Sequence, residues 1–295
     1  MAITASMVKE LRERTGAGMM ECKKALVETD GNIESAIELM RKSGMAKADK
    51  KAGRVAADGL VFIETDMDKR NAAIVEVNCE TDFVAKGDDF KGFVHAIAAR
   101  VLSSSPANVE ELMGMPLNDD SAKTIDEVRR EMISKIGENV TIRRFERVST
   151  AGGVLGAYSH GDRIGVLVDL TGGSEELARD IAMHVAASRP LCVGEADVPA
   201  DILAKEKEIF AAQAAESGKP AEIVEKMVEG RIRKYLKEVT LLGQMFVKDP
   251  DTSIEKLVAS ANASVSSFRR FEVGEGIEKK QENFADEVMA QVKGS

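Results

Sequence analysis

Two stretches of the sequence, FVHAIAARVLSSSP at residues 93–106 and LARDIAMHVAASRP at residues 177–190, match each other in length and in apolar positions. In both, apolar residues recur three and four positions apart, which is typical of an amphipathic helix. Each stretch follows two runs rich in β-branched residues joined by a turn, within residues 60–77 and 154–168. This internal repeat predicts two β-β-α subdomains in a core of the α+β class.

The two copies differ in the connection between the second strand and the helix. This connection has 15 residues in the first copy, Asn78 to Gly92, and 8 residues in the second copy, Asp169 to Glu176. The extra length corresponds to the region of residues 81–87. Because the second copy is expected to reach the same fold without this segment, we infer that the segment serves function rather than folding.

The extra segment begins with Thr81, Asp82, Phe83 and Val84, and Lys86 follows, so an aromatic side chain stands between an acidic and a basic one. Such a tip is suited to a partner protein, because the ring can fill a pocket while the charges set the register. The alternative is that Phe83 packs into the core of its own subdomain.

The first 46 residues predict a small module of three helices. The first is capped by Thr4 and stops at Gly16, the second runs from about Met19 to Thr29, and the third is capped by Asn32 and stops at Gly44. Residues 47–54 hold four basic side chains and no large apolar one, so we expect a solvated linker at 47–56. A three-helix unit of this size is more often a binding module than a site for chemistry.

The remaining chain is divided by its patterning. Core subdomain 1 is expected at 57–145, with a surface excursion at 107–124, and core subdomain 2 at 146–192 together with 241–275, which holds a last strand. Between the two parts of subdomain 2, residues 193–240 predict an antiparallel helical hairpin broken at Ser217-Gly218-Lys219-Pro220, where glycine ends one helix and proline begins the next. Residues 276–295 predict a C-terminal helix.

Composition argues against several classes of function. A net charge of −9 is unsuited to neutralising phosphates, so direct binding of nucleic acid is not expected. No apolar run reaches the roughly 20 residues of a membrane span, and the N-terminus lacks the plan of a signal peptide. The three cysteines are far apart and form no CxxC pair, which fits a reducing cytosol.

Candidate chemical sites have weak signatures. The acidic pairs lack calcium-loop spacing, Gly16-Ala17-Gly18 follows a helix rather than a strand, and no Ser/His/Asp or Cys/His arrangement is coherent. We therefore expect no metal, no cofactor and no catalytic residue. Met19 and Met20 are adjacent, so we do not expect both side chains to face the same small core. His160 lies at a hairpin turn. For these three residues, contact with a partner and simple surface placement both remain open.

Several motifs together resemble the bacterial elongation factor Ts family, the guanine-nucleotide exchange factors of elongation factor Tu, over essentially the whole chain. They are VKELR (8–12), TGAGMM (15–20), VNCETDFVAK (77–86), KIGEN (135–139), HG (160–161), KMVEGR (226–231) and RFEVGEG (270–276). The resemblance is weakest around residues 105–124.

The resemblance implies that the N-terminal module is UBA-like and docks, with the Asp82-Phe83 tip, on the GTPase domain of elongation factor Tu. Arg12, Met19 and Met20 are then contacts, and Thr81 to Val84 match the family segment tied to dislodging Mg²⁺. His160 and the terminal helix would make further contacts. The hairpin resembles the family's coiled-coil module, which implies a homodimer or a 2:2 complex.

The expected function is that of a cytoplasmic translation elongation factor that is not an enzyme and that promotes GDP release from elongation factor Tu. Two alternatives remain open from the residues themselves. One is an adaptor or chaperone-like protein that uses the three-helix module and its exposed methionines. The other is an enzyme with Asp82 as a general base.

Overall fold

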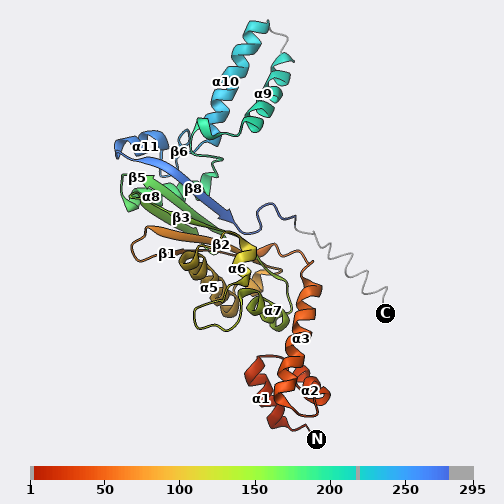
Figure 1. Cartoon of the computed structure of the whole chain (residues 1–295). Coiled ribbons are helices and arrows are strands. Elements are labelled where there is room, and N and C mark those ends of the chain that lie inside the picture. The colour runs from red at the N-terminus through yellow and green to blue at the C-terminus, as the bar shows by residue number, and fades with distance from the viewer. Residues whose placement is uncertain (1–2, 217–219, 279–295) are drawn as a thin grey trace.

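The computed structural model describes residues 3–216 and 220–278. Figure 1 shows an elongated molecule with the three N-terminal helices at one end, two β-sheets and their helices in the middle, and a helical hairpin at the other end. The mixed helix and strand content confirms the predicted α+β class. None of the helices in these ranges is long and apolar enough to cross a membrane.

The N-terminal module consists of α1 (Ala5–Thr15), α2 (Met19–Glu28) and α3 (Ile33–Lys51). The expected caps are present, since Thr4 Oγ1 accepts a hydrogen bond from Met7 N and Asn32 Oδ1 accepts one from Ser35 N. Gly16 ends α1 with a φ of 67°, a left-handed conformation that a residue without a Cβ adopts readily. Apolar side chains from all three helices form the module's own core, with Leu11, Cys22, Ala25, Leu26 and Ala36 buried in it.

The expected stop at Gly44 is wrong, and so is the linker over residues 47–51, because α3 continues through Gly44 to Lys51. Only residues 52–56 of the expected linker lie between α3 and β1, outside any helix or strand. Gly44 and Ala48 are buried one helical turn apart, and Ala48 belongs to the core of subdomain 1. A Cβ at Gly44 would lie 3.0 Å from Ser134 Oγ on α7 (Ile125–Ile136). The glycine therefore allows two helices to approach closely, and this tertiary packing outweighs its low helix propensity.

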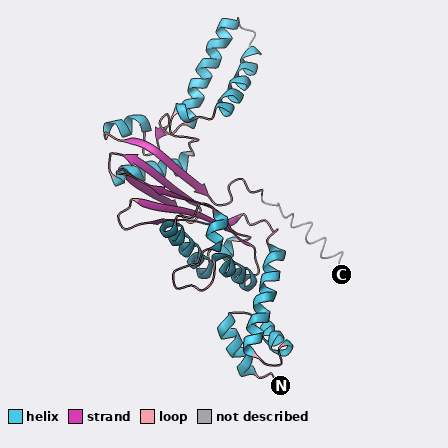
Figure 2. Ribbon diagram, viewed as in Figure 1, coloured by secondary structure: helices cyan, strands magenta, loops and turns pink. Residues whose placement is uncertain are grey.

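Two three-stranded antiparallel sheets form the centre of the molecule (Figure 2). The first has the order β1 (Asp58–Thr65), β2 (Asn71–Cys79), β3 (Val140–Ser149), and the second has the order β4 (Val154–His160), β5 (Ile164–Thr171), β8 (Ser264–Glu272). Helix α5 (Asp88–Ser104) follows β2, and α8 (Glu175–Ser188) follows β5. The predicted β-β-α repeat is therefore present. Its two helices end alike, on the left-handed residues Ser105 and Arg189, each directly before a proline.

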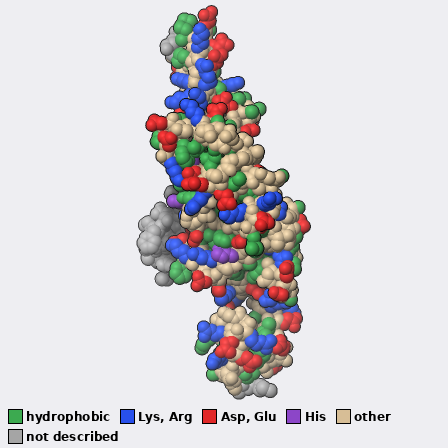
Figure 3. Space-filling model, turned by 90° about the vertical axis from the view of Figure 1, so that its left-hand side faces the viewer, with side chains coloured by type: hydrophobic (Ala, Val, Ile, Leu, Met, Phe, Trp, Pro, Cys, Tyr) green, Lys and Arg blue, Asp and Glu red, His purple; other side chains and the backbone are tan. Residues whose placement is uncertain are grey.

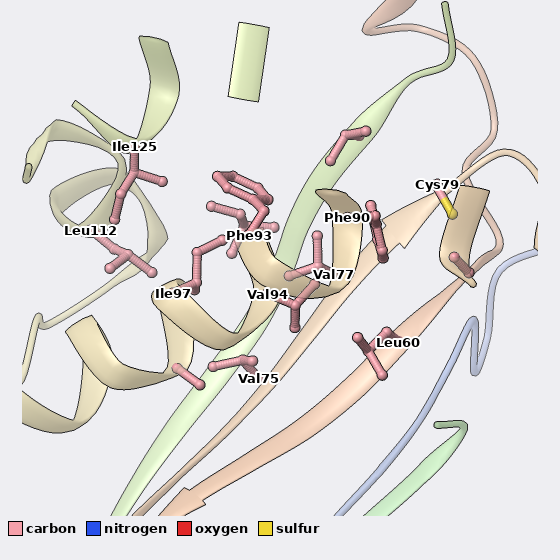
Figure 4. Packing of buried hydrophobic residues seen from close by; sticks show 14 of the residues in the cluster. Leu60, Val75, Val77, Cys79, Phe90, Phe93, Val94, Ile97, Leu112 and Ile125 are labelled. Atoms are coloured by element: carbon pink, nitrogen blue, oxygen red, sulfur yellow. The ribbon is translucent and has the colours of Figure 1, made fainter. Parts of the chain in front are cut away.

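The first sheet is buried on both faces. Figure 4 shows Phe90, Phe93, Val94 and Ile97 of α5 lying against Leu60, Val75 and Val77 of β1 and β2. The opposite face packs on the second sheet, with Val61, Ile74, Leu155, Leu167 and Phe271 buried together. Gly165 allows this close approach, since a Cβ there would lie 2.6 Å from Val61 Cγ1.

The predicted boundary between the subdomains at 145/146 is also wrong, since it falls within β3. This strand pairs with β2 along its whole length, from Cys79 opposite Val140 to Asn71 opposite Ser149. The excursion at 107–124 is only partly superficial, because α6 (Val109–Gly114) buries Leu112 in the core of subdomain 1. The last strand of subdomain 2 is confirmed as β8, and it is preceded by β6 (Met245–Phe246), β7 (Asp249–Ser253) and α11 (Ile254–Ser260).

The hairpin consists of α9 (Ala200–Ala215) and α10 (Ala221–Val239), with the short 3₁₀ turn η1 (Glu195–Asp197) before it. The helices are antiparallel, as predicted. Phe210 meets Tyr235 edge to face at 6.2 Å, and Arg231 Nη1 donates to Gln213 Oε1 at 2.8 Å. Of the predicted break, residues 217–219 lie outside the described residues, as does the predicted C-terminal helix from residue 279 onward.

Candidate partner-binding site

The extra segment of the first repeat folds into α4 (Asp82–Ala85), a helix of one turn between β2 and α5. Thr81 is its N-cap, with Oγ1 accepting a hydrogen bond from Val84 N at 3.4 Å. Val84 and Ala85 are buried in the core of subdomain 1, whereas Phe83 is 84% exposed. The alternative that Phe83 packs into its own core is therefore wrong. The helix presents the ring to solvent and is held by the two residues that follow it.

The charges beside Phe83 are paired with each other. Lys86 Nζ lies 2.6 Å from Asp82 Oδ2 across one helical turn, and both side chains are exposed. The hydrogen bond from Lys86, together with its charge, lowers the pKa of Asp82, and the same contact raises the pKa of Lys86. Both groups are therefore ionised at neutral pH. The tip consists of an exposed ring with one anion and one cation beside it.

Beneath the tip, Cys79 ends β2 and is buried. Burial, followed by the nearby charges of Glu138 and Asp58, raises the pKa of the Cys79 thiol to about 12. The thiol is therefore protonated at neutral pH and donates to the carbonyl oxygen of Thr81 at 3.1 Å. A neutral, buried thiol of this kind is a structural donor and a poor nucleophile.

The N-terminal module carries a second exposed apolar feature. Met19 and Met20 begin α2 with exposed fractions of 59% and 78%, so neither contributes to the small core. Arg12, in the last turn of α1, is exposed as well. Methionine side chains are flexible and polarisable, which suits a contact surface.

His160 ends β4 at the β4–β5 turn and is exposed, with Nδ1 3.2 Å from the hydroxyl of Tyr158. This turn lies beside subdomain 1, because Asp162 Oδ2 is 3.3 Å from Lys91 Nζ on the first turn of α5. The structure therefore brings the turn of His160 to the same end of α5 as α4. Helices α1 and α2, to which Arg12, Met19 and Met20 belong, lie apart from α5 at the N-terminal end of the molecule (Figure 1).

Sequence reasoning missed the residues that hold α4 in place. Glu138 and Asn139, in the connection between α7 and β3, form hydrogen bonds with Thr81 and Glu80. The partners are more than 50 positions apart in the chain, so no local pattern indicates the contact. The KIGEN motif at 135–139 was the available signal, but it indicated no role.

Within residues 3–216 and 220–278, no group of three or more His, Cys, Asp or Glu is arranged to hold a metal ion. What the arrangement can do is present an apolar ring and two charges to another macromolecule. On the face shown in Figure 3, acidic and basic side chains are interspersed from the hairpin end to the N-terminal end.

Comparison with known proteins gives a consistent result. The family model described as Elongation factor TS matches residues 80–275, so the match begins directly before Thr81. An elongation factor Ts from Thioalkalivibrio sulfidiphilus is 65% identical, and one from Methylococcus capsulatus is 64% identical, each over the full length of both chains. A third, from Hydrogenovibrio crunogenus, is 61% identical over 98% of each chain.

Proposed function

Because the chain belongs to the elongation factor Ts family of translation elongation factors, we propose that it is the guanine-nucleotide exchange factor of elongation factor Tu. In this proposal it binds the GDP form of that GTPase, displaces Mg²⁺ and promotes GDP release, so that GTP can rebind. It acts through protein–protein contact in the cytoplasm, without a cofactor and without catalytic residues of its own.

The observation that carries the proposal is the exposed ring of Phe83 on a short helix that only one of the two repeats possesses. Fully burying a phenylalanine side chain is worth about 1.5–3 kcal/mol. At about 1.4 kcal/mol per tenfold change, one ring in a partner pocket changes affinity roughly 10- to 150-fold. Asp82 and Lys86, both ionised, then set the register of the ring against the partner.

Exchange follows from linkage between two ligands of the same GTPase. Mg²⁺ and the phosphate-binding loop hold GDP through many charge-assisted contacts. If Thr81 to Val84 stabilise a loop position of the partner that cannot coordinate Mg²⁺, they weaken GDP binding. Reciprocity requires that GDP weakens the factor's own binding by an equal factor. Free nucleotide therefore rebinds and releases the factor. The released factor can then act on another molecule of the GTPase.

The other predicted partner contacts follow from the resemblance to the elongation factor Ts family. The UBA-like N-terminal module, through Arg12, Met19 and Met20, binds the GTPase domain, and His160 contacts another part of the partner. The hairpin supports a homodimer or a 2:2 complex, because Ile209 and Ile223 leave apolar surface exposed on it. The interspersed charges and the net charge of −9 favour a protein partner over nucleic acid.

The experiment is release of a fluorescent GDP from purified elongation factor Tu on addition of this chain. The wild-type chain should accelerate release at substoichiometric concentration. Asp82→Ala combined with Phe83→Ala should lower the stimulated rate of GDP release at least tenfold. The variant lacks both the ring and the carboxylate that sets its register against the partner. Met67→Ala is the matched control, since Met67 is a fully exposed apolar side chain in the β1–β2 turn, and it should act as wild type.

The outcomes separate the alternatives. Unchanged release with the double variant would contradict the role of α4. A complex that forms stoichiometrically and dissociates on addition of GDP would count against both the adaptor and the enzyme alternatives. Capture of unrelated unfolded proteins, indifferent to GDP, would instead support the adaptor.

A further inference from the structure

We propose that Glu138 is a positioning residue for nucleotide exchange, because its carboxylate holds α4 in the conformation that docks on the partner. We call Glu80, Thr81, Glu138 and Asn139 the clasp. The inference rests on the proposed function of α4 and adds a residue that makes no contact with the partner in that proposal.

Glu138 binds Thr81 with both carboxylate oxygens. Thr81 N donates to Glu138 Oε2 at 3.0 Å, and Thr81 Oγ1 donates to Glu138 Oε1 at 2.7 Å. A hydroxyl has one proton to donate, so this bond turns the lone pairs of Thr81 Oγ1 toward Val84 N, which lies 3.4 Å away. Glu138 therefore orients the Thr81 hydroxyl as the N-cap of α4.

The clasp is reciprocal. While Glu138 accepts from the backbone of Thr81, Glu80 Oε1 accepts from the backbone N–H of Asn139 at 2.6 Å. Two successive residues of one segment thus bond to two successive residues of the other. Loss of one side chain leaves the other bond intact, so a substitution at Glu138 is expected to loosen α4 without separating the segments.

The same turn is attached to the end of α3. Asn139 Nδ2 donates to the carbonyl oxygen of Arg54 at 2.8 Å, and Lys51 Nζ donates to the carbonyl oxygen of Gly137. One turn, residues 137–139, therefore contacts both the N-terminal module and the start of α4. The module carries Met19 and Met20, and α4 carries Phe83. This arrangement presents two separate apolar features in a fixed relation before any partner binds.

A helix of one turn needs such support. Isolated helices shorter than about 12–15 residues are marginal in water, because the first turn orders several residues for one hydrogen bond. Without Glu138, α4 would be less firmly ordered before docking, and the ordering still required would oppose the step in which Phe83 enters its pocket. The effect should appear in the maximal rate of release more than in the concentration of factor required, because the N-terminal module still binds.

The test uses the full chain, elongation factor Tu and fluorescent GDP, with the release rate measured against factor concentration. Glu138→Ala should lower the maximal release rate roughly tenfold and change the half-saturating concentration less than threefold. Glu138→Gln should have a maximal release rate between those of wild type and Glu138→Ala, because its amide oxygen still accepts from Thr81 Oγ1. Glu131→Ala is the matched control, since Glu131 also accepts twice, from Lys123 Nζ at 2.7 Å, on the exposed surface of α7.

Hydrogen exchange distinguishes positioning from a general structural role. In Glu138→Ala the amides of Val84 and Ala85 should exchange at least tenfold faster, while those of β2 keep their wild-type rates. Added to Phe83→Ala, the substitution should have no further effect on release, because the helix then carries no ring to position. If Glu138→Ala unfolds the protein, Glu138→Gln replaces it.

Two results would overturn the inference. One is release at the wild-type maximal rate by both Glu138 variants. The other is a lowered rate with unchanged exchange at Val84 and Ala85. If instead the wild-type chain does not stimulate release at all, the proposed function itself fails. Stimulation by wild type, impairment by Phe83→Ala and wild-type behaviour of the Glu138 variants would reject the positioning role alone.

Discussion

Replacing Glu76 by alanine is expected to lower the free energy of unfolding by about 3–5 kcal/mol. The Glu76 side chain on β2 is completely buried, and its carboxylate accepts from Arg143 Nη1 at 2.9 Å, Arg144 Nε at 2.6 Å and Gly274 N at 2.8 Å. Arg143 and Arg144 lie on β3, and Gly274 follows β8, so one carboxylate joins both subdomains.

The magnitude follows from what the substitution leaves behind. A hydrogen bond to a charged group is worth about 1.5–3 kcal/mol, so these three, with a fourth from Asn78 Nδ2 at 3.3 Å, would suggest a larger total. The arginine side chains are 26% and 33% exposed, however, and water can solvate them once the carboxylate is gone. The loss is therefore limited to about 3–5 kcal/mol, the range for breaking a buried pair. Glu76→Gln keeps an acceptor oxygen and should lose about 1–3 kcal/mol.

The assay is urea unfolding followed by circular dichroism. Glu146→Ala is the matched control, because Glu146 also joins the subdomains, from β3 to Arg269 on β8, but through a pair that is about 40% exposed. Exposed pairs contribute about 0–1 kcal/mol, so this variant should stay close to wild type. A loss below about 1 kcal/mol for Glu76→Ala would contradict this prediction, since it would mean that the buried carboxylate contributes no more than an exposed one.

Two further predictions concern packing and pH. Gly44→Val should destabilise the protein by about 1–3 kcal/mol in urea unfolding, because the side chain would meet Ser134 of α7, and an unchanged midpoint would contradict the close approach of α3 and α7. His184 is buried, with Nε2 2.9 Å from Gln244 Oε1 and Nδ1 accepting from Val247 N at 3.3 Å, and burial lowers its pKa below the ordinary 6.5. The unfolded chain then binds a proton first as the pH falls below 6.5, so stability should decrease there. His184→Asn should lose less stability than wild type between pH 7 and 5.5, and parallel pH profiles would argue against a neutral, buried imidazole.

The elements that the sequence predicted well are those whose signal is local. The helices at 93–106 and 177–190 bury apolar side chains at the expected spacing, and Thr4 and Asn32 cap their helices as expected. In each case the side chains that determine the element lie within a few residues of one another. Periodicity and capping therefore carry the information without knowledge of the rest of the chain.

The failures share a different cause. Arg143 and Arg144 are consecutive residues of β3, so they interrupt the alternation of apolar and polar residues that predicts a strand. In the fold both side chains bind the Glu76 carboxylate of β2. The continuation of α3 through Gly44 depends on α7, more than 80 positions further along the chain. In both cases a residue that is unfavourable locally is accommodated by a partner that only the fold supplies.

The residues alone indicate that residues 81–87 are an insertion in one of two repeats, and that Phe83 stands there between charges. The folded chain is needed to see that the insertion is a capped helical turn, that Phe83 faces solvent, and that Glu138 binds Thr81 at the start of this turn. The physical reason is that exposure and long-range hydrogen bonds are properties of the assembled fold. The contacts that position this tip join segments that the chain itself keeps far apart.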